Sequence, residues 1–211
     1  MAIGGPDTPR LYLIADHEYC GDTERWLDLI DTAVEALPDR FPAALQLRAK
    51  ELSGAARDAM LEAALDRLSN RPVPVFINGA GIDAASVRTR AVHWPESAIP
   101  TRPQPVPVGF RRAASIHSAD AAWHAAVAGA EFGVFAPVFD PGSKPGSGRG
   151  VETLRELVEA VDLPILALGG VDTARVGECL QAGAAGVAVV SSVFGADDPG
   201  AAVRELAAAL G

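Results

Sequence analysis

The sequence predicts a single α/β domain folded as a closed (β/α)8 barrel, the TIM-barrel class, with a degenerate helical segment after its fourth strand. Short apolar segments alternate with amphipathic segments along the chain. Strict alternation of this kind implies parallel strands joined by right-handed crossovers. Eight strand–helix units can be counted, and eight units close a barrel, although 211 residues are near the short end for one. The alternative, a doubly wound open sheet, usually needs only about five or six strands.

The first half of the chain supplies four strands and two helices. Each expected strand is a short apolar run, as in a strand buried on both faces, and each expected helix has apolar residues at spacings of three and four. A Pro-rich stretch, Pro95–Pro107, stands where a third helix would follow the fourth strand. The expected strands are Leu11–Ala15, Ala43–Leu47, Val73–Ile77 and Ala91–Trp94, and the expected helices are Thr23–Leu37 and Ser53–Leu68.

The second half resumes the regular alternation. Between the sixth strand and the next helix lies the loop Asp140–Gly150, with four glycines and two prolines. A loop of this length and composition is usually functional, although a plain flexible connection is the alternative. The expected strands are Ala113–His117, Phe132–Phe135, Pro164–Leu168 and Gly186–Val190, and the helices are Ser118–Gly129, Val151–Val161, Asp172–Ala182 and Pro199–Leu210.

Composition limits the chain to one domain and excludes several classes of partner. Hydrophobic residues make up 49% of the chain, enough for a large core, and we expect residues 1–10 to be a tail and 11–211 the domain. Acidic residues outnumber basic ones by 27 to 18, and a field of that sign repels nucleic acid and anionic membranes. Cys20 and Cys179 are too few for a disulfide framework or a metal cluster. The sequence shows neither a signal peptide nor an apolar run of about 18 residues, so we expect a cytoplasmic protein.

Polar residues at the ends of the expected strands are the candidate functional residues. In such barrels the carboxyl ends of the strands form the functional face. Gln46, Arg48 and Lys50 alternate and therefore share one side, Asn78 ends the third strand, and the fifth ends in Ser115-Ile116-His117-Ser118. His17 and His93 also lie near strand ends, so position alone does not choose among the histidines. The alternative for each residue is a surface polar group that closes a strand.

The ends of the seventh and eighth strands indicate a phosphate site. The seventh strand ends in Gly169-Gly170, and the eighth ends at Val190 before Ser191-Ser192. Backbone N–H groups at these two strand ends often bind phosphate in barrels, and glycine lets the backbone approach closely. A turn that requires positive φ is the alternative. With Arg48 and Lys50, the loop residues Lys144 and Arg149 form a cationic mouth on an acidic protein, which favours a small anionic ligand.

Seven segments, in order and at matching spacing, resemble the thiamine phosphate synthase / TenI family. The resemblance implies the barrel fold and a role in thiamine biosynthesis, and it covers most of the chain. The segments are LYLIAD (11–16), QLRAK (46–50), FING (76–79), SIHS (115–118), APVFDPGSKPG (136–146), LALGGV (166–171) and AGAAGVAVVSSVF (182–194).

The synthase of this family joins a pyrimidine pyrophosphate to a thiazole phosphate with magnesium, and the chain departs from its pattern. The family has Asp at the positions of Gly79 and Ala98, and threonines at those of Pro141 and Ser143. One nearby carboxylate, Glu96, is a poor anchor for magnesium pyrophosphate. The magnesium-dependent reaction is therefore not the expected one.

The departures are similar to the TenI branch, which includes thiazole tautomerases that aromatise a carboxylated thiazole phosphate without a metal. The resemblance implies that His117 is the acid and base of this proton transfer, a task that imidazole suits at neutral pH. It places Arg48 and Lys50 against the substrate carboxylate or ring. It also implies phosphate binding by Gly169, Gly170, Val190, Ser191 and Ser192, and substrate binding by Gln46, Asn78, Ser115, Ser143 and Lys144.

We therefore expect a metal-independent thiazole phosphate tautomerase with no cofactor, a small phosphorylated substrate and a possible homo-oligomeric assembly. The alternative is a thiamine phosphate synthase that uses magnesium, and a second alternative is a non-catalytic thiazole phosphate-binding or regulatory protein. A pair of carboxylates converging beside Asn78 would favour the synthase. The sequence offers Asp16, Glu96 and Asp140 as candidates for that pair.

Overall fold

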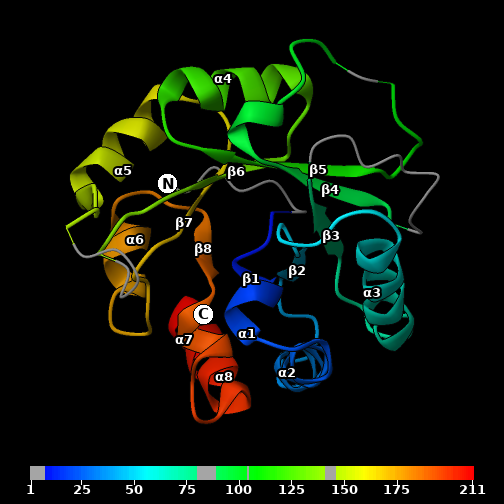
Figure 1. Cartoon of the computed structure of the whole chain (residues 1–211). Coiled ribbons are helices and arrows are strands. Elements are labelled where there is room, and N and C mark those ends of the chain that lie inside the picture. Colours follow the sequence, from blue (N-terminus) through cyan, green and yellow to red (C-terminus); the bar gives the residue numbers. More distant parts are fainter. Residues whose placement is uncertain (1–7, 80–88, 104, 141–145) are drawn as a thin grey trace.

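The computed structural model describes residues 8–79, 89–103, 105–140 and 146–211, and it shows a closed parallel barrel (Figure 1). Each strand pairs in parallel with the next one along the chain, and β8 returns to pair with β1. This confirms the (β/α)8 prediction. The strands are β1 (Leu11–Asp16), β2 (Ala43–Arg48), β3 (Val75–Asn78), β4 (Ala91–Trp94), β5 (Arg111–Ile116), β6 (Phe132–Phe135), β7 (Ile165–Ala167) and β8 (Gly186–Val189).

The helices pack around the outside of the barrel, where an outer apolar cluster joins them to the strands. Side-chain caps start three of them: Asp22, Ser118 and Asp198 each accept the N–H of the residue three positions later, at 2.8–3.1 Å. The helices are α1 (His17–Cys20), α2 (Thr23–Glu35), α3 (Gly54–Arg67), α4 (Ala119–Ala128), α5 (Gly150–Ala160), α6 (Val176–Gln181), α7 (Ser191–Phe194) and α8 (Pro199–Leu210). Among the described residues, none of these helices combines the length and apolar character that a membrane crossing requires.

Several local predictions need correction. The helices α1 and α7 were not expected, because segments of four residues are too short to show helical periodicity. The helix α6 begins at Val176, because Asp172 accepts the N–H of Arg175 in a preceding turn. Arg10, assigned to the tail, is tied to the barrel, since its carbonyl accepts the Val187 N–H at 2.9 Å. Residues 1–7 of the expected tail lie outside the described residues.

The Pro-rich segment after β4 contains no α-helix in its described residues. A single 3₁₀ turn, η1 (Glu96–Ala98), follows the strand directly. This confirms the prediction of a degenerate segment at this point. The turn matters for the site, because it brings Glu96 to the end of β5.

The two faces of each strand have different surroundings, as the period of two predicts. Outward side chains join the outer apolar cluster, and the inward ones form a separate lumen cluster inside the barrel. Its aromatic centre is Tyr12, Phe76 and Phe132, whose ring centroids lie 5.2–5.6 Å apart in edge-to-face pairs. The other buried members are Ile14, Ala44, Ala91, Ala113, Val134, Leu166 and Ala188. The lumen is therefore a packed core, with the Arg111 guanidinium over the Phe76 ring at the start of β5 and polar side chains toward the carboxyl ends of the strands.

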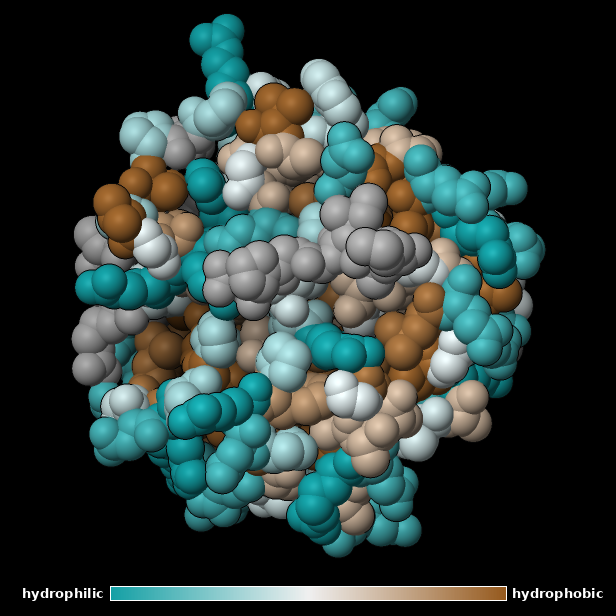
Figure 2. Space-filling view, turned by 180° about the vertical axis from the view of Figure 1, so that it is seen from behind, coloured by the Kyte–Doolittle hydropathy of each residue, from teal (hydrophilic) through white to brown (hydrophobic). Residues whose placement is uncertain are grey.

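The exposed surface carries few large apolar side chains. Those with the greatest exposed fractions among the described residues are Val108, Trp123, Tyr19 and Val127. On the face seen in Figure 2, polar residues are interspersed with separate apolar areas. The surface is thus mixed on this side of the molecule.

Substituting Gly186 by alanine should weaken the closure of the barrel. A Cβ at this position would lie 2.4 Å from the Arg10 carbonyl oxygen and 2.7 Å from its Cα, and backbone cannot move away as a side chain can. We expect Gly186→Ala to lower the free energy of unfolding by about 1–3 kcal/mol, measured by urea denaturation. Gly177→Ala is the matched control, because nothing lies within 4 Å of its Cβ on α6. That variant should gain about 0.5–1 kcal/mol from helix propensity. Equal effects of the two substitutions would contradict the close contact.

Candidate functional site

The inner wall of the barrel mouth contains a chain of hydrogen-bonded polar side chains. Gln46 Nε2 donates to the Tyr12 hydroxyl at 3.4 Å, and this hydroxyl lies 3.2 Å from His93 Nδ1. His93 Nε2 lies 2.9 Å from Ser115 Oγ. The first three side chains are buried, and Ser115 is half-buried. The sequence predicted Gln46 and Ser115 as site residues. The structure connects them through Tyr12 and His93, to which the sequence analysis had assigned no role.

Burial controls the charge of the groups in this chain. It lowers the pKa of His93 to about 3, and the nearby positive charge of Lys50 acts in the same direction. Burial also raises the pKa of Tyr12 well above its usual value. His93 and Tyr12 are therefore both neutral near neutral pH. Lys50 itself lies just past the end of β2 and is exposed by surface area. The surrounding protein still removes part of the water around its ammonium group, and this desolvation, with the nearby charge of Arg48, lowers its pKa.

His117 lies at the rim, directly after β5, and its ring is exposed. Its Nδ1 is 3.0 Å from the Ala136 carbonyl oxygen. A carbonyl can only accept, so Nδ1 carries the proton and Nε2 of the neutral ring is left as an acceptor. The His117 backbone N–H donates to Glu96 Oε2 at 2.6 Å, and Arg149 donates to the His117 carbonyl. The ring and the backbone of His117 are thus both held in place.

The predicted cationic mouth is only partly present. Arg48 forms an ion pair with Asp16, so its charge is balanced within the protein. Burial raises the pKa of Asp16, and the Arg48 charge opposes this shift. Arg149 packs over the Phe135 ring, with its guanidinium carbon 4.9 Å from the ring centroid. Lys144 and Ser143 lie outside the described residues. Lys50 and Arg149 are both exposed without an ion pair among the described residues, but the Arg149 guanidinium already donates to the His117 carbonyl, which leaves Lys50 as the less engaged cation.

The turn after β7 agrees with both interpretations of Gly169-Gly170, a turn that requires positive φ and a set of backbone donors for an anion. Both glycines have positive φ, 98° and 60°, and a Cβ on either would lie 2.6–2.7 Å from the segment Pro137–Asp140. Glycine is therefore required by the turn itself. Within the described part of the chain, the N–H groups of Gly169, Gly170, Ser191 and Ser192 donate to no protein group. These donors remain available to an anion.

The segment after β6 connects His117 with the glycine turn. The Ala136 carbonyl holds the His117 ring, and the following residues pack on Gly169 and Gly170. The Phe139 N–H donates to the Gly169 carbonyl at 3.0 Å. Arg48 ends β2, and His117 and Gly170 follow the ends of β5 and β7, so all three lie at the same end of the closed parallel barrel.

The described residues do not fit the magnesium site that the synthase pattern implies. Gly79 and Ala98 have no side-chain oxygen. Asp16 is paired with Arg48, Glu96 accepts the His117 N–H, and Asp140 accepts the Gly148 N–H at 2.7 Å. No described group of three His, Cys, Asp or Glu residues could hold a metal ion. Two buried oxygens among the described residues, Asn78 Oδ1 and Asp16 Oδ1, have no hydrogen-bond partner, and the other Asp16 oxygen is paired with Arg48. One amide and one such carboxylate are a weak ligand set for magnesium.

His17 has a packing role. It is buried between Glu51, which contacts its Nδ1 at 2.5 Å, and Thr23, whose hydroxyl lies 3.1 Å from its Nε2. Its ring also contacts Trp26 edge to face. These contacts join the ends of β1 and β2 to α2.

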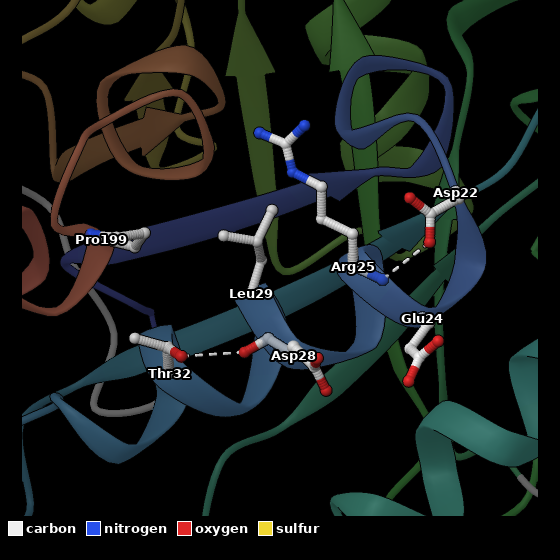
Figure 3. Close-up of a pocket in the computed structure, with 7 residues that line it drawn as sticks. All are labelled: Asp22, Glu24, Arg25, Asp28, Leu29, Thr32 and Pro199. Carbon is white, nitrogen blue, oxygen red and sulfur yellow. Dashed lines mark hydrogen bonds between the residues drawn. The ribbon is translucent and has the colours of Figure 1, made fainter.

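A hollow of about 390 Å³ lies on the outside of the barrel, on α2 beside the start of α8 (Figure 3). It contains none of the predicted site residues and is far richer in carboxylates than an anion site should be. Its lining residues are Asp22, Glu24, Arg25, Asp28, Leu29, Thr32 and Pro199. The hollow is therefore not part of the candidate site.

Solved structures with the same fold include phosphate-related enzymes. A thiamine phosphate pyrophosphorylase from Pyrococcus furiosus superimposes with a TM-score of 0.75 at 24% identity, covering 97% of this chain and 96% of that one. A 3-hexulose-6-phosphate synthase superimposes with a TM-score of 0.70 at 20% identity, covering 96% and 100%. At these identities the likeness supports the fold alone.

Sequence comparisons are more specific. A thiamine-phosphate synthase from Methanoculleus marisnigri is 36% identical over 202 residues, covering 93% of this chain and 92% of that protein. One from Roseiflexus castenholzii is 33% identical over 200 residues, covering 93% and 86%. These names support the synthase alternative better than the tautomerase expectation, which they do not test at the level of the reaction. The family model described as thiamine monophosphate synthase matches residues 11–193. The chain belongs to the thiamine monophosphate synthase family.

Proposed function

We propose that the protein acts on a thiazole phosphate in thiamine biosynthesis and binds it at the carboxyl ends of the strands. Family membership supports the pathway. The N–H groups of Gly169, Gly170, Ser191 and Ser192, which donate to no group in the described residues, support a phosphate site, with Val190 in the backbone between β8 and the serines. Backbone donors bind an anion without adding positive side chains, which suits an acidic protein.

The reaction that the site geometry supports best is a metal-free proton transfer by His117. One observation carries this proposal: the Ala136 carbonyl holds the Nδ1 proton, so Nε2 is presented as a base at an exposed rim position. The base removes a proton from a ring carbon that lies next to a carboxylate and a C=N bond. The resulting conjugate acid returns a proton to the exocyclic carbon, so the ring becomes aromatic without a change in oxidation state.

Lys50 is our candidate for the substrate carboxylate. It is exposed beyond the end of β2, whereas Arg48 is already paired with Asp16. Gln46, Asn78 and Ser115 are proposed to contact the ring from the wall of the mouth, where Asn78 Oδ1 is buried with no partner among the described residues. Ser143 and Lys144 stay in the proposal as substrate-binding residues.

Thiamine phosphate synthesis is the second candidate, and the names of the relatives favour it. The fold, the expected thiazole phosphate and the phosphate site are common to both reactions. The two candidates differ at the positions of Gly79 and Ala98, where carboxylates for a magnesium pyrophosphate are missing. These local differences are the reason that the proton transfer is placed first.

An assay of purified protein with both sets of substrates distinguishes the candidates. We expect conversion of the carboxylated thiazole phosphate at the same rate with magnesium and with EDTA, because no metal is needed for the proton transfer. Magnesium-dependent formation of thiamine phosphate at ordinary enzyme rates would establish the synthase instead. Binding of thiazole phosphate with turnover of neither substrate set would identify a non-catalytic binding protein.

Replacing His117 tests the proposed base directly. His117→Gln retains hydrogen bonding but cannot take up the proton, so we expect the rate of tautomerisation to fall by about 10²–10⁴-fold. Affinity for thiazole phosphate should be largely unchanged, because the phosphate donors are untouched. His124→Gln is the matched control: His124 is an exposed histidine on α4, and its loss should leave the rate unchanged. A folded, fully active His117→Gln protein would remove this residue from the mechanism.

A further inference from the structure

The hydrogen-bonded chain in the barrel wall has a definite direction. The Gln46 amide nitrogen can only donate, so the Tyr12 oxygen accepts from it. Tyr12 has one hydroxyl proton, and the neighbouring His93 Nδ1, 3.2 Å away, is its acceptor. A neutral imidazole that accepts at Nδ1 carries its proton on Nε2. His93 Nε2–H therefore donates to Ser115 Oγ, 2.9 Å away.

The surroundings keep His93 in this one form. Its ring is 1% exposed and stacks on Tyr12, with 5.7 Å between the ring centroids and 21° between the planes. Burial and the nearby charge of Lys50 both disfavour the imidazolium. The reverse direction would require Gln46 to present its amide oxygen to Tyr12, whereas the amide nitrogen faces the hydroxyl in the structure. The direction of donation along these hydrogen bonds is thus set at the buried end of the series, by the Gln46 amide.

This order decides what Ser115 can offer to a ligand. Its oxygen already accepts from His93, and in the described structure it has no second polar contact. The hydroxyl proton is left to donate, and Ser115 lies at the partly exposed end of the chain. A serine without such a neighbour donates or accepts according to the ligand.

We propose that His93 is a positioning residue: held by Tyr12 as the Nε2–H tautomer, it makes Ser115 a committed hydrogen-bond donor to an acceptor atom of the bound heterocycle. This selects ligands that present an unprotonated ring nitrogen or an oxygen to Ser115, and it disfavours ligands that present an N–H. The identity of the ligand as a thiazole phosphate rests on the proposed function. The tautomer of His93 does not.

The tautomer is measured without any ligand. Nitrogen NMR of protein labelled at histidine distinguishes the two neutral tautomers, and the missing signals in His93→Gln assign the resonance among the four histidines. We expect His93 to be neutral with its proton on Nε2 from about pH 5 to pH 8, well above its lowered pKa. A proton on Nδ1, or an imidazolium, would overturn the proposal.

Binding of thiazole phosphate tests the consequence for Ser115. His93→Phe keeps an aromatic ring against Tyr12 but cannot donate, and we expect the Kd to rise about 10-fold, the size of one lost hydrogen bond to a buried partner. His93→Gln, whose amide can accept from Tyr12 and donate to Ser115, should restore most of the affinity. Ser115→Ala should cost as much as His93→Phe, and the double variant should be no worse than either single one. The Kd for inorganic phosphate should be the same in all of them.

The controls separate a positioning role from a loss of packing. Val92→Ala removes an outward side chain on the same strand, so it should lower the thermal midpoint without changing the Kd. If His93→Phe does not fold, Tyr12→Phe supplies the second variant, because it removes the hydroxyl that fixes the tautomer and keeps the ring. Additive losses in the double variant, or unchanged affinity in a folded His93→Phe, would overturn the proposal. If the wild-type protein binds no thiazole phosphate, the proposed function fails, and the tautomer measurement still decides the role of His93.

Discussion

Pairing of β8 with β1 is the constraint on which the rest of the structure depends. Leu11, Tyr12 and Leu13 lie opposite Val187, Ala188 and Val189, so the first and last strands complete the barrel. The close contact between Gly186 and the Arg10 backbone brings them together. Closure carries all eight parallel strands to one rim, and residues far apart in the chain meet there only because of it. Every candidate site residue in the described structure is located by this geometry.

Inside the closed barrel, an apolar layer and a polar layer depend on each other. The edge-to-face rings of Tyr12, Phe76 and Phe132 fill the lumen and exclude water from it. In the absence of water, the polar side chains above them must satisfy one another, which accounts for the unbroken chain from Gln46 to Ser115. Tyr12 belongs to both layers: its ring packs among the aromatics, and its hydroxyl starts the ordering of protons toward the rim.

At the rim, the segment after β6 contacts both the His117 ring and the glycine turn after β7. It holds the His117 ring through Ala136 and requires glycine at positions 169 and 170 through its close packing. The proposed base and the proposed anion donors are thus held by the same short piece of backbone. The family relationship accounts for the barrel, and the proposed phosphate site lies at the same end of it as His117.

The sequence by itself determined the barrel, the order of its strands and most of their limits to within one residue, because spacings of two and of three to four residues reflect local burial. It also placed Gln46, Ser115, His117 and Gly169-Gly170 at strand ends. Only the tertiary structure decided which polar groups are already bonded within the protein. Arg48, expected to bind the ligand, forms an ion pair with Asp16 instead. It also distinguished the histidines, since His17, His93 and His117 all follow or end apolar runs, yet one is packed, one is in the lumen and one is exposed at the rim. Contacts between strands that are distant in sequence set burial and hydrogen-bond partners, and a local pattern contains no information about them.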